Sequence, residues 1–228
     1  MRAPISIVIP TLNAVDELPG TLAALGEGLE AGILRELVLS DGGSEDDIET
    51  LATEAGADLV RGPAGRGGQL ARGAAAAKGA WLLFLHADTR LSEGWSRAAQ
   101  AHMRENPRMA GYFRLRFRTE GIAPRLAAGW ANLRSRRFGL PYGDQGLLIP
   151  RPLYDSVGGY RDIPLMEDVE MARALSGRLA LLPAEALTSA ARYENGGWIR
   201  HGAGNLARLA RHRLGADPET LAAEYRRR

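Results

Sequence analysis

Residues 81–88, WLLFLHAD, combine an apolar run with two side chains that could bind a metal ion. A buried strand rarely ends on a carboxylate unless that carboxylate has a partner or a chemical role. If the segment is extended, His86 and Asp88 face the same side and can reach one ion. Imidazole and carboxylate suit Mn²⁺ or Mg²⁺ when phosphate oxygens complete the coordination. The alternative is a capped strand end, with Asp88 bonded to Arg90.

Two adjacent acids, Glu167 and Asp168, stand in the segment MEDVEM, where a helix is predicted to begin. One explanation is electrostatic, because a helix N-terminus favours carboxylates. The other is a general base that takes a proton from a reacting hydroxyl group. Asp144 lies in the segment YGDQG, which has a glycine near each end. Asp144 is expected to line the same cleft as Glu167 and Asp168.

Two glycine-containing segments could contact a nucleotide. Asp41 in SDGGS either closes a turn, as Asp-Gly favours, or accepts a hydrogen bond from a base or ribose. Residues 62–68, GPAGRGG, are similar to a phosphate loop but lack the Gly-Lys-Ser/Thr ending and the Gly-x-Gly-x-x-Gly spacing. Arg66 in this loop could pair with a diphosphate through its guanidinium group.

The elements that must position these residues alternate between strand and helix. Strands are expected at residues 5–9, 36–39, 57–62 and 81–88. Helices are expected at residues 15–30 and 45–55, and in the alanine-rich segment after the glycine loop. This alternation predicts a parallel sheet with helices on both faces over the first 90 residues. Because ligands bind beyond the carboxyl ends of parallel strands, the polar segments are expected to converge at one edge.

The second half of the chain is less regular. Helices are expected at residues 94–106, 167–177 and 198–225, and strands within residues 111–119, 143–160 and 179–183. The tail contains apolar residues and arginines, and its apolar residues are Trp198, Ile199, Leu206, Leu209 and Leu214. Three interpretations of the tail stay open: it packs on the domain, it packs against a second subunit in a homodimer, or it makes peripheral membrane contact.

Composition limits the function classes. The 228 residues are 45% hydrophobic and 25% charged, which suits one globular domain with a sizeable core. The net charge of +2 lacks the broad basic excess of a nucleic-acid-binding protein. The absence of cysteine excludes disulfides and thiolate metal sites. No stretch has the length of a signal-peptide core or a membrane span, so the protein is expected to be soluble and cytoplasmic.

Taken in order, these segments resemble the family 2 glycosyltransferases. Residues 5–13, ISIVIPTLN, are similar to the opening strand of that family. Residues 39–44, LSDGGS, are similar to its Asp-Asp-Gly-Ser turn, with Gly42 in place of the second Asp. Residues 86–88 occupy the place of the Asp-x-Asp motif, and Glu167-Asp168 the place of the Glu-Asp pair. The segments LLFLHADTRL, YGDQG and PLMEDVEM resemble a compact soluble subgroup of the family.

The resemblance implies an α/β protein with the GT-A fold, a Rossmann-like, mostly parallel central sheet flanked by helices, with a C-terminal helical tail. One domain is expected over residues 1–228, with a nucleotide-sugar-binding half (1–90), an acceptor half (91–195) and the tail (196–228). The implied enzyme is an inverting glycosyltransferase that moves a sugar from a UDP- or GDP-sugar to a hydroxyl acceptor, with Mn²⁺ or Mg²⁺ as cofactor. The sequence does not identify the sugar or the acceptor.

Site residues follow from the resemblance by position. Asp168 is the implied general base, with Glu167 beside it, and Asp88 is the implied metal ligand, with His86 in place of the first Asp. The implied nucleotide-sugar contacts are Pro10, Thr11, Asn13, Asp41, Gly43, Arg66, Gln69, Ala87, Asp144 and Arg192. Two other hypotheses stay open: a sugar nucleotidyltransferase, and a non-catalytic nucleotide-sugar-binding protein in which His86 marks a degraded metal site.

Overall fold

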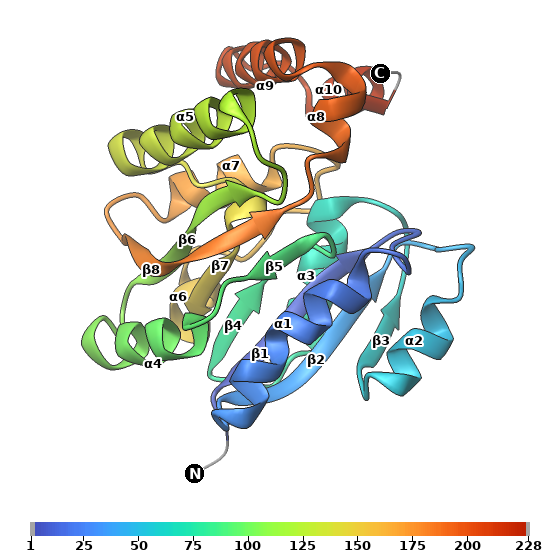
Figure 1. Cartoon of the computed structure of the whole chain (residues 1–228), viewed down its shortest axis with the longest axis vertical. Coiled ribbons are helices and arrows are strands. Elements are labelled where there is room, and N and C mark those ends of the chain that lie inside the picture. Colours follow the sequence, from blue (N-terminus) through green and yellow to red (C-terminus); the bar gives the residue numbers. More distant parts are fainter. Residues whose placement is uncertain (1–2, 227–228) are drawn as a thin grey trace.

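The structure is a computed structural model that describes residues 3–226 (Figure 1). Within that range, the side chains at positions 192, 195, 196, 199, 213, 223, 225 and 226 lie outside the description. One eight-stranded sheet forms the centre, in the order β3-β2-β1-β4-β7-β6-β8-β5. Its strands are β1 (Ile5–Thr11), β2 (Leu34–Asp41), β3 (Asp58–Arg61), β4 (Trp81–Phe84), β5 (Thr89–Leu91), β6 (Ala110–Phe117), β7 (Leu147–Pro150) and β8 (Leu179–Thr188).

The first four strands are parallel, as the sequence predicts. β1 lies between β2 and β4, and β3 pairs with the outer side of β2. Residues Ile5–Ile9 are all buried, which explains why isoleucine and valine occupy both faces of this strand and the one polar residue, Ser6, is hydrogen-bonded. The other strands make the sheet mixed: β7 is antiparallel to β4 and β6, β8 is parallel to β6, and β5 is antiparallel to β8.

Helices cover both faces of the sheet (Figure 1). They are α1 (Leu18–Glu30), α2 (Ile48–Glu54), α3 (Arg66–Ala76), α4 (Trp95–Glu105), α5 (Ile122–Phe138), α6 (Arg151–Ser156), α7 (Glu167–Ala174), α8 (Ala191–Gly196), α9 (Trp198–Arg213) and α10 (Pro218–Arg226), with a 3₁₀ turn η1 (Gly143–Gln145). On one face, Leu25 and Trp95 of α1 and α4 pack on β1. On the other face, Leu70 and Met171 of α3 and α7 pack in a second core. No helix within residues 3–226 has the length and apolar character to cross a lipid bilayer.

Several elements differ from the sequence-based expectation, and the short elements β5, α6 and α8 are not predicted. The strand expected at 81–88 ends at Phe84, and residues 87–88 form a turn before β5. The strand expected at 179–183 continues to Thr188, because it pairs with β6 on one side and β5 on the other. Helix α5 is not predicted at all, because its large apolar residues do not lie on its buried face.

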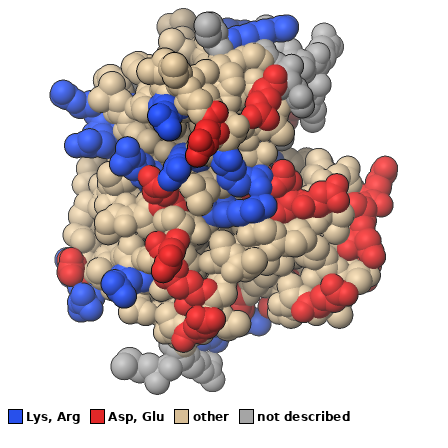
Figure 2. All heavy atoms as spheres, viewed as in Figure 1, with Lys and Arg blue, Asp and Glu red and all other residues tan. Residues whose placement is uncertain are grey.

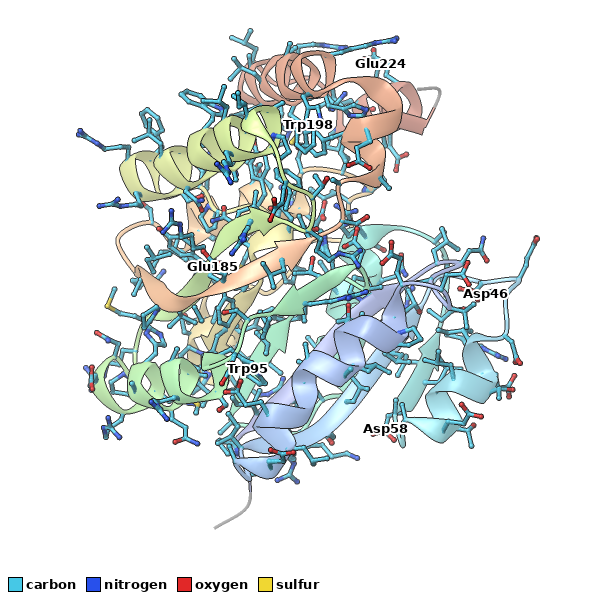
Figure 3. All side chains as sticks on the ribbon, in the orientation of Figure 1. Asp46, Asp58, Trp95, Glu185, Trp198 and Glu224 are labelled. Carbon is cyan, nitrogen blue, oxygen red and sulfur yellow. The ribbon has the colours of Figure 1, made fainter. Side chains whose placement is uncertain are left out.

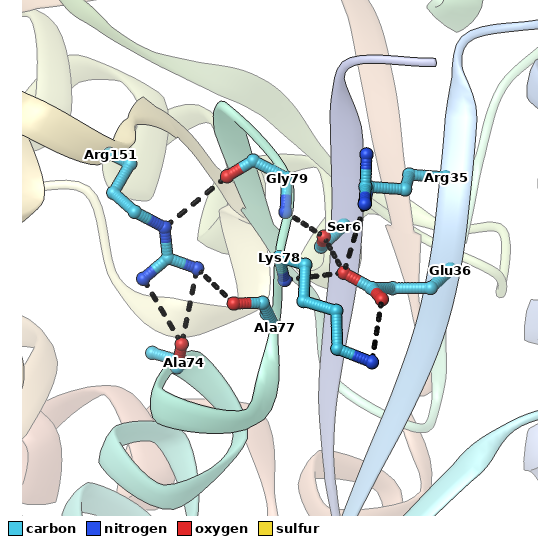
Figure 4. Close-up of polar contacts among 8 residues, drawn as sticks. All are labelled: Ser6, Arg35, Glu36, Ala74, Ala77, Lys78, Gly79 and Arg151. Carbon is cyan, nitrogen blue, oxygen red and sulfur yellow. Dashed lines mark hydrogen bonds and ion pairs between the residues drawn. The ribbon is translucent and has the colours of Figure 1, made fainter. Parts of the chain in front are cut away.

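A polar network fixes α3 at the end remote from its first turn (Figure 4). Glu36 of β2 accepts a hydrogen bond from the backbone N–H of Lys78 at 2.5 Å. Arg151 of α6 donates to the carbonyl oxygens of Ala74 and Ala77 at 3.2 and 2.6 Å. These carbonyls belong to the last turn of α3, where a cation is electrostatically favourable. The network therefore joins the two halves of the chain and holds in place the helix that carries Arg66 and Gln69.

Candidate active site

The Asp41 carboxylate closes the turn after β2. One oxygen, Oδ2, accepts hydrogen bonds from the N–H groups of Gly43 and Ser44 at 3.0 and 2.9 Å. The other, Oδ1, accepts from the hydroxyls of Thr11 and Ser44 at 3.1 and 2.5 Å. Burial alone would raise the pKa of Asp41, but the hydrogen bonds from Ser44, Gly43 and Thr11 lower it below its usual value. The structure therefore favours the turn-closing interpretation of Asp41, and contact with a base or ribose stays a prediction.

The side-chain amides of Asn13 and Gln69 join the turn at Asp41 to the segments beside it. The Asn13 side-chain oxygen accepts a hydrogen bond from the N–H of Glu45 at 2.9 Å. The Gln69 side chain, from α3, donates to the carbonyls of Thr11 and Ser40 at 2.7 and 2.9 Å. The ends of β1 and β2 and the start of α3 thus meet at one edge, which confirms that part of the predicted convergence. Gln69 is 5% exposed, so it supports the site from inside.

The glycines of the 62–68 segment have a packing role. Gly67 donates its N–H to the carbonyl of Ile163 at 3.2 Å. A Cβ at Gly67 would overlap the carbonyl oxygen of Arg161 and approach the backbone of Ile163. The start of α3 is therefore pressed against the loop that leads into α7. This contact brings Arg66 close to Glu167.

We expect Gly67→Ala to destabilise the fold by about 1–3 kcal/mol, because the backbone it contacts cannot move aside like a flexible side chain. Gly26→Ala in α1 is the matched control, because a Cβ there meets nothing within 4 Å. Replacing a helix glycine with alanine should stabilise by about 0.5–1 kcal/mol. Urea unfolding of both variants measures the difference. Equal midpoints for the two variants would contradict the close approach.

The two acids at the start of α7 lie in different environments. Glu167 is 1% exposed, neither of its oxygens has a hydrogen-bond partner, and the Arg66 Nε lies 3.7 Å from its Oε1. Burial raises the pKa of Glu167 to about 8; the neighbouring Asp168 adds to the shift and Arg66 opposes it. Asp168 is half-buried, and its two oxygens accept hydrogen bonds from the N–H groups of Gly143 and Val169 at 3.0 and 2.7 Å.

Asp144 and Asp88 add two carboxylates near Asp168. Asp144 is partly exposed, but its Oδ1 is inaccessible and has no hydrogen-bond partner. Burial raises the pKa of Asp144 to about 6; Arg134 opposes the shift, and Asp168 and Asp88 add to it. Arg134, from α5, lies over the Tyr142 ring at 3.3 Å. Arg134 is not among the residues predicted from the sequence, because no helix is predicted over the range of α5.

His86 lies against the 3₁₀ turn that carries Asp144. A Cβ at Gly143 would be 2.5 Å from the His86 Nε2, so a larger residue there would require the imidazole to move. The prediction that His86 and Asp88 lie together on an extended strand is wrong, because residues 87–88 form a turn. A small cavity of ≈ 20 Å³, large enough for one water, lies beside Asp168 and Gly143.

The other predicted contacts fall at the same edge, with one exception. Pro10 is half-buried at the end of β1, opposite Ser40 of β2. Gly43 has a φ of +91°, which favours glycine in that turn. The carbonyl of Ala87 accepts a hydrogen bond from the Thr21 hydroxyl at 2.7 Å. The side chain of Arg192 lies outside the described residues.

Backbone strain marks the same region. Among residues 3–226, two non-glycine residues have a positive φ: Asn13 at 49° and Met166 at 70°. Asn13 belongs to the turn after β1, and Met166 directly precedes the Glu167-Asp168 pair. Such conformations persist where surrounding contacts impose them, and they cluster at functional sites. Both strained residues therefore support this edge as the candidate active site.

Comparison with known sequences decides the family. Residues 6–153, more than half of the chain, match glycosyl transferase family 2. The chain belongs to this family. Among curated proteins, none matches the sequence significantly. The predicted membership of family 2 is confirmed. The assignment of the individual motifs and membership of the compact subgroup stay predictions.

Solved structures show the fold of this family 2 chain. TarS 1–349 of S. aureus with UDP-GlcNAc matches with a TM-score of 0.61 and 15% identity, over 81% of this chain and 58% of that chain. Glucosyl-3-phosphoglycerate synthase of Mycobacterium tuberculosis with Mn²⁺, UDP and phosphoglyceric acid matches at 0.54 and 22%, over 78% and 67%. GalNAc-T7 with UDP, GalNAc and Mn²⁺ matches at 0.63 and 17%, over 82% and 44%. The predicted GT-A fold is confirmed, and the chain spans only part of these proteins.

The carboxylates at this edge suit a divalent ion whose remaining ligands come from a bound molecule. Within residues 3–226, no group of three or more His, Asp or Glu side chains is preassembled for a metal. Nevertheless, Asp88, Asp144 and Asp168 concentrate negative charge, and the Asp144 Oδ1 is buried without a hydrogen-bond partner. Carboxylate oxygens suit a hard cation such as Mg²⁺ or Mn²⁺ that takes its remaining ligands from phosphate.

We expect Glu167 to make the stability of the wild type depend on pH. Its pKa is higher in the folded state than the usual 4.5, so between pH 4.5 and about 8 the folded state holds a proton that the unfolded state has lost. The free energy of unfolding therefore falls as pH rises through this window. Glu167→Gln should remove that fall, which amounts to a few kcal/mol at about 1.4 kcal/mol per pKa unit.

Urea unfolding at pH 5 and pH 8 measures this difference between the wild type and Glu167→Gln. Glu49→Gln is the matched control, because the Glu49 side chain is 72% exposed and should leave the wild-type pH dependence in place. If Glu167→Gln and the wild type lose the same free energy between the two pH values, Glu167 is not the responsible group.

Proposed function

We propose that the protein is an inverting glycosyltransferase that uses a nucleotide-diphosphate sugar as donor and a hydroxyl compound as acceptor. The observation that carries the proposal is the position of Asp168. This carboxylate is oriented by the Gly143 N–H and lies near Asp88 and Asp144, in the candidate site where Arg66 links α7 to α3. Family membership supports the reaction class.

The donor is proposed to lie along the edge between the Asp41 turn and α3. The two turns that follow β1 and β2 would hold the nucleoside, and Arg66 would face the diphosphate. The solved structures of TarS and GalNAc-T7 are complexes with UDP-GlcNAc and with UDP, which supports a uridine nucleotide as the first candidate. GDP remains the alternative base, and Arg192 remains a proposed contact to the diphosphate.

The proposed reaction breaks one bond to the sugar C1 and forms another. The bond between the sugar C1 and the diphosphate oxygen breaks, and its electron pair stays on the β-phosphate. The acceptor oxygen forms a bond to C1 from the opposite face, which inverts the configuration, and Asp168 takes the acceptor proton. A buried Glu167 with a raised pKa keeps its proton near neutral pH, so it adds no second negative charge beside Asp168.

Asp88 is the residue proposed to hold a divalent ion, with His86 as a candidate second ligand. When bound, such an ion neutralises the charge that develops on the leaving diphosphate. Two of the similar structures contain Mn²⁺, which supports this choice of cofactor. Arg66 assists from the side of α3, because its guanidinium can pair with phosphate oxygens.

Isothermal titration of UDP, GDP and their sugars into the full chain, with and without Mn²⁺, tests the proposal. We expect one nucleotide to bind more tightly with Mn²⁺ and its sugar to be slowly hydrolysed. Metal-dependent binding without any hydrolysis would favour a non-catalytic nucleotide-sugar-binding protein. Release of pyrophosphate from a nucleoside triphosphate and a sugar phosphate would favour a nucleotidyltransferase. The absence of binding under all conditions would overturn the proposal. A cytoplasmic location and the absence of nucleic-acid binding stay predictions.

A further inference from the structure

Helix α5 presents large apolar side chains to solvent. Ile122, Leu126, Trp130 and Leu133, called the α5 stripe below, are between 48% and 78% exposed. Their spacing of four, four and three residues places them on one face of the helix. The opposite face is buried through small residues such as Ala128 and Ala131. Adjacent exposed apolar side chains of this size indicate an interaction surface, whereas single ones need no explanation.

The charges of α5 are all positive. Arg125, Arg136 and Arg137 are exposed, and the helix contains no Asp or Glu. The asymmetry extends to the chain: residues 1–90 hold seven Lys and Arg against thirteen Asp and Glu, and residues 91–228 hold 22 against 14. Figure 2 shows blue side chains gathered over the upper part of the molecule, where α5 lies, and red ones over α2.

We propose that the outer face of α5 docks on an anionic lipid surface. An apolar face flanked by arginines is the pattern of helices that lie in the plane of a membrane. Tryptophan is favoured at the boundary between lipid and water, as Trp130 would be. The arginines would contact the lipid phosphates, which attract basic side chains near the surface. A helix of 17 residues is about 25 Å long, so it offers an extended line of contact.

A second copy of the chain fits this face less well. A symmetric dimer through α5 would place arginines against arginines in either orientation, because the helix contains no acid to pair with them. Head groups of anionic lipids supply the missing negative charge. The surface thus matches a lipid layer in both its apolar and its charged parts.

The tail, which the sequence analysis considered for this contact, is less suited. Trp198 packs edge-on against Phe117 and stacks on Tyr193, near the start of α9 (Figure 3). Leu209 is buried, so Leu206 and Leu214 are the large apolar side chains that the described part of the tail exposes.

Five residues after α5 ends, the chain reaches Gly143 of the candidate active site. Docking through α5 would therefore hold that site close to the lipid surface.

Vesicle sedimentation tests the inference with the full chain. The wild type is expected to pellet with vesicles of phosphatidylcholine and phosphatidylglycerol (7:3) and much less with phosphatidylcholine alone. Leu126→Ser/Leu133→Ser should lower the partition coefficient at least tenfold. Leu29→Ser/Leu181→Ser, which removes two leucines of similar exposure elsewhere, should behave as the wild type. Arg136→Ser/Arg137→Ser should weaken binding by about fivefold per arginine and reduce its salt dependence.

Three results would overturn the inference. The first is a wild type that does not pellet with the anionic vesicles. The second is equal pelleting of Leu126→Ser/Leu133→Ser and the wild type. The third is a wild type that light scattering shows to be a dimer and a Leu126→Ser/Leu133→Ser variant that is a monomer. The α5 stripe would then be a dimer interface. Thermal midpoints confirm that the variants fold. Nucleotide titration tests the donor site separately, so a failure of the proposed function is distinguishable.

Discussion

Replacing Asp168 with asparagine is expected to lower the rate of donor cleavage by about 10²–10⁴-fold, with nucleotide affinity within twofold of the wild type. Asparagine has nearly the same shape and keeps an oxygen that accepts the Gly143 N–H, which now lies 3.0 Å from the Asp168 Oδ2. It cannot take a proton from the attacking hydroxyl. The measurement is release of the nucleotide from the sugar nucleotide that binds in titration, with water as acceptor.

Asp155→Asn is the matched control for this change, because Asp155 is an exposed residue of α6. Its rate should equal that of the wild type. If Asp168→Asn also keeps the wild-type rate within threefold, Asp168 is not the base. Asp144 would then be the next candidate, because its pKa of about 6 suits proton transfer near neutral pH.

The second large effect is expected for Asp88→Asn, which should abolish the gain in nucleotide affinity that Mn²⁺ provides. The loss should be about 10²-fold, because a metal bridge to phosphate is worth several kcal/mol and an amide is a weak ligand for a hard cation. Asp88 is half-buried in the turn after β4, and its charge influences Asp144. Titration of the nucleotide with and without Mn²⁺ measures the change.

Asp16→Asn is the control, because Asp16 is exposed before the first turn of α1. It should retain the full effect of Mn²⁺. His86→Ala resolves the role of the imidazole: a loss similar to that of Asp88→Asn would make His86 a ligand, and a small loss would limit it to packing against Gly143. An Asp88→Asn variant that still binds nucleotide more tightly with Mn²⁺ would contradict the proposed metal site.

The burial of each carboxylate in the site depends on the tertiary structure and not on its place in the sequence. Glu167 and Asp168 are adjacent in the sequence, yet Glu167 is almost fully buried and Asp168 is half-exposed. Burial raises the pKa of Glu167 to about 8, so the buried member of the pair holds a proton at neutral pH.

The sequence by itself determined the parallel half of the sheet and the polar segments that follow its strands. Short β-branched runs such as residues 5–9 favour strands buried on both faces, and alternation with helices makes these strands parallel. Polar segments that follow such strands must meet at the carboxyl edge. The turn at Asp41 and the start of α3 were therefore predictable as neighbours at that edge. The acids at the start of α7 do not follow a parallel strand, and only the family resemblance assigned them to the same site.

Only the tertiary structure decided how those groups are used. Whether the Asp41 carboxylate faces a ligand or its own turn depends on four hydrogen bonds, from Thr11, Gly43 and twice from Ser44, that no local pattern specifies. The turn at residues 87–88 ends the strand that periodicity extended to Asp88. Helix α5 escaped prediction because its face toward the body is made of small residues and its large apolar residues point outward. Packing between distant segments sets burial, and burial determines both the charges of the site and the free face of α5.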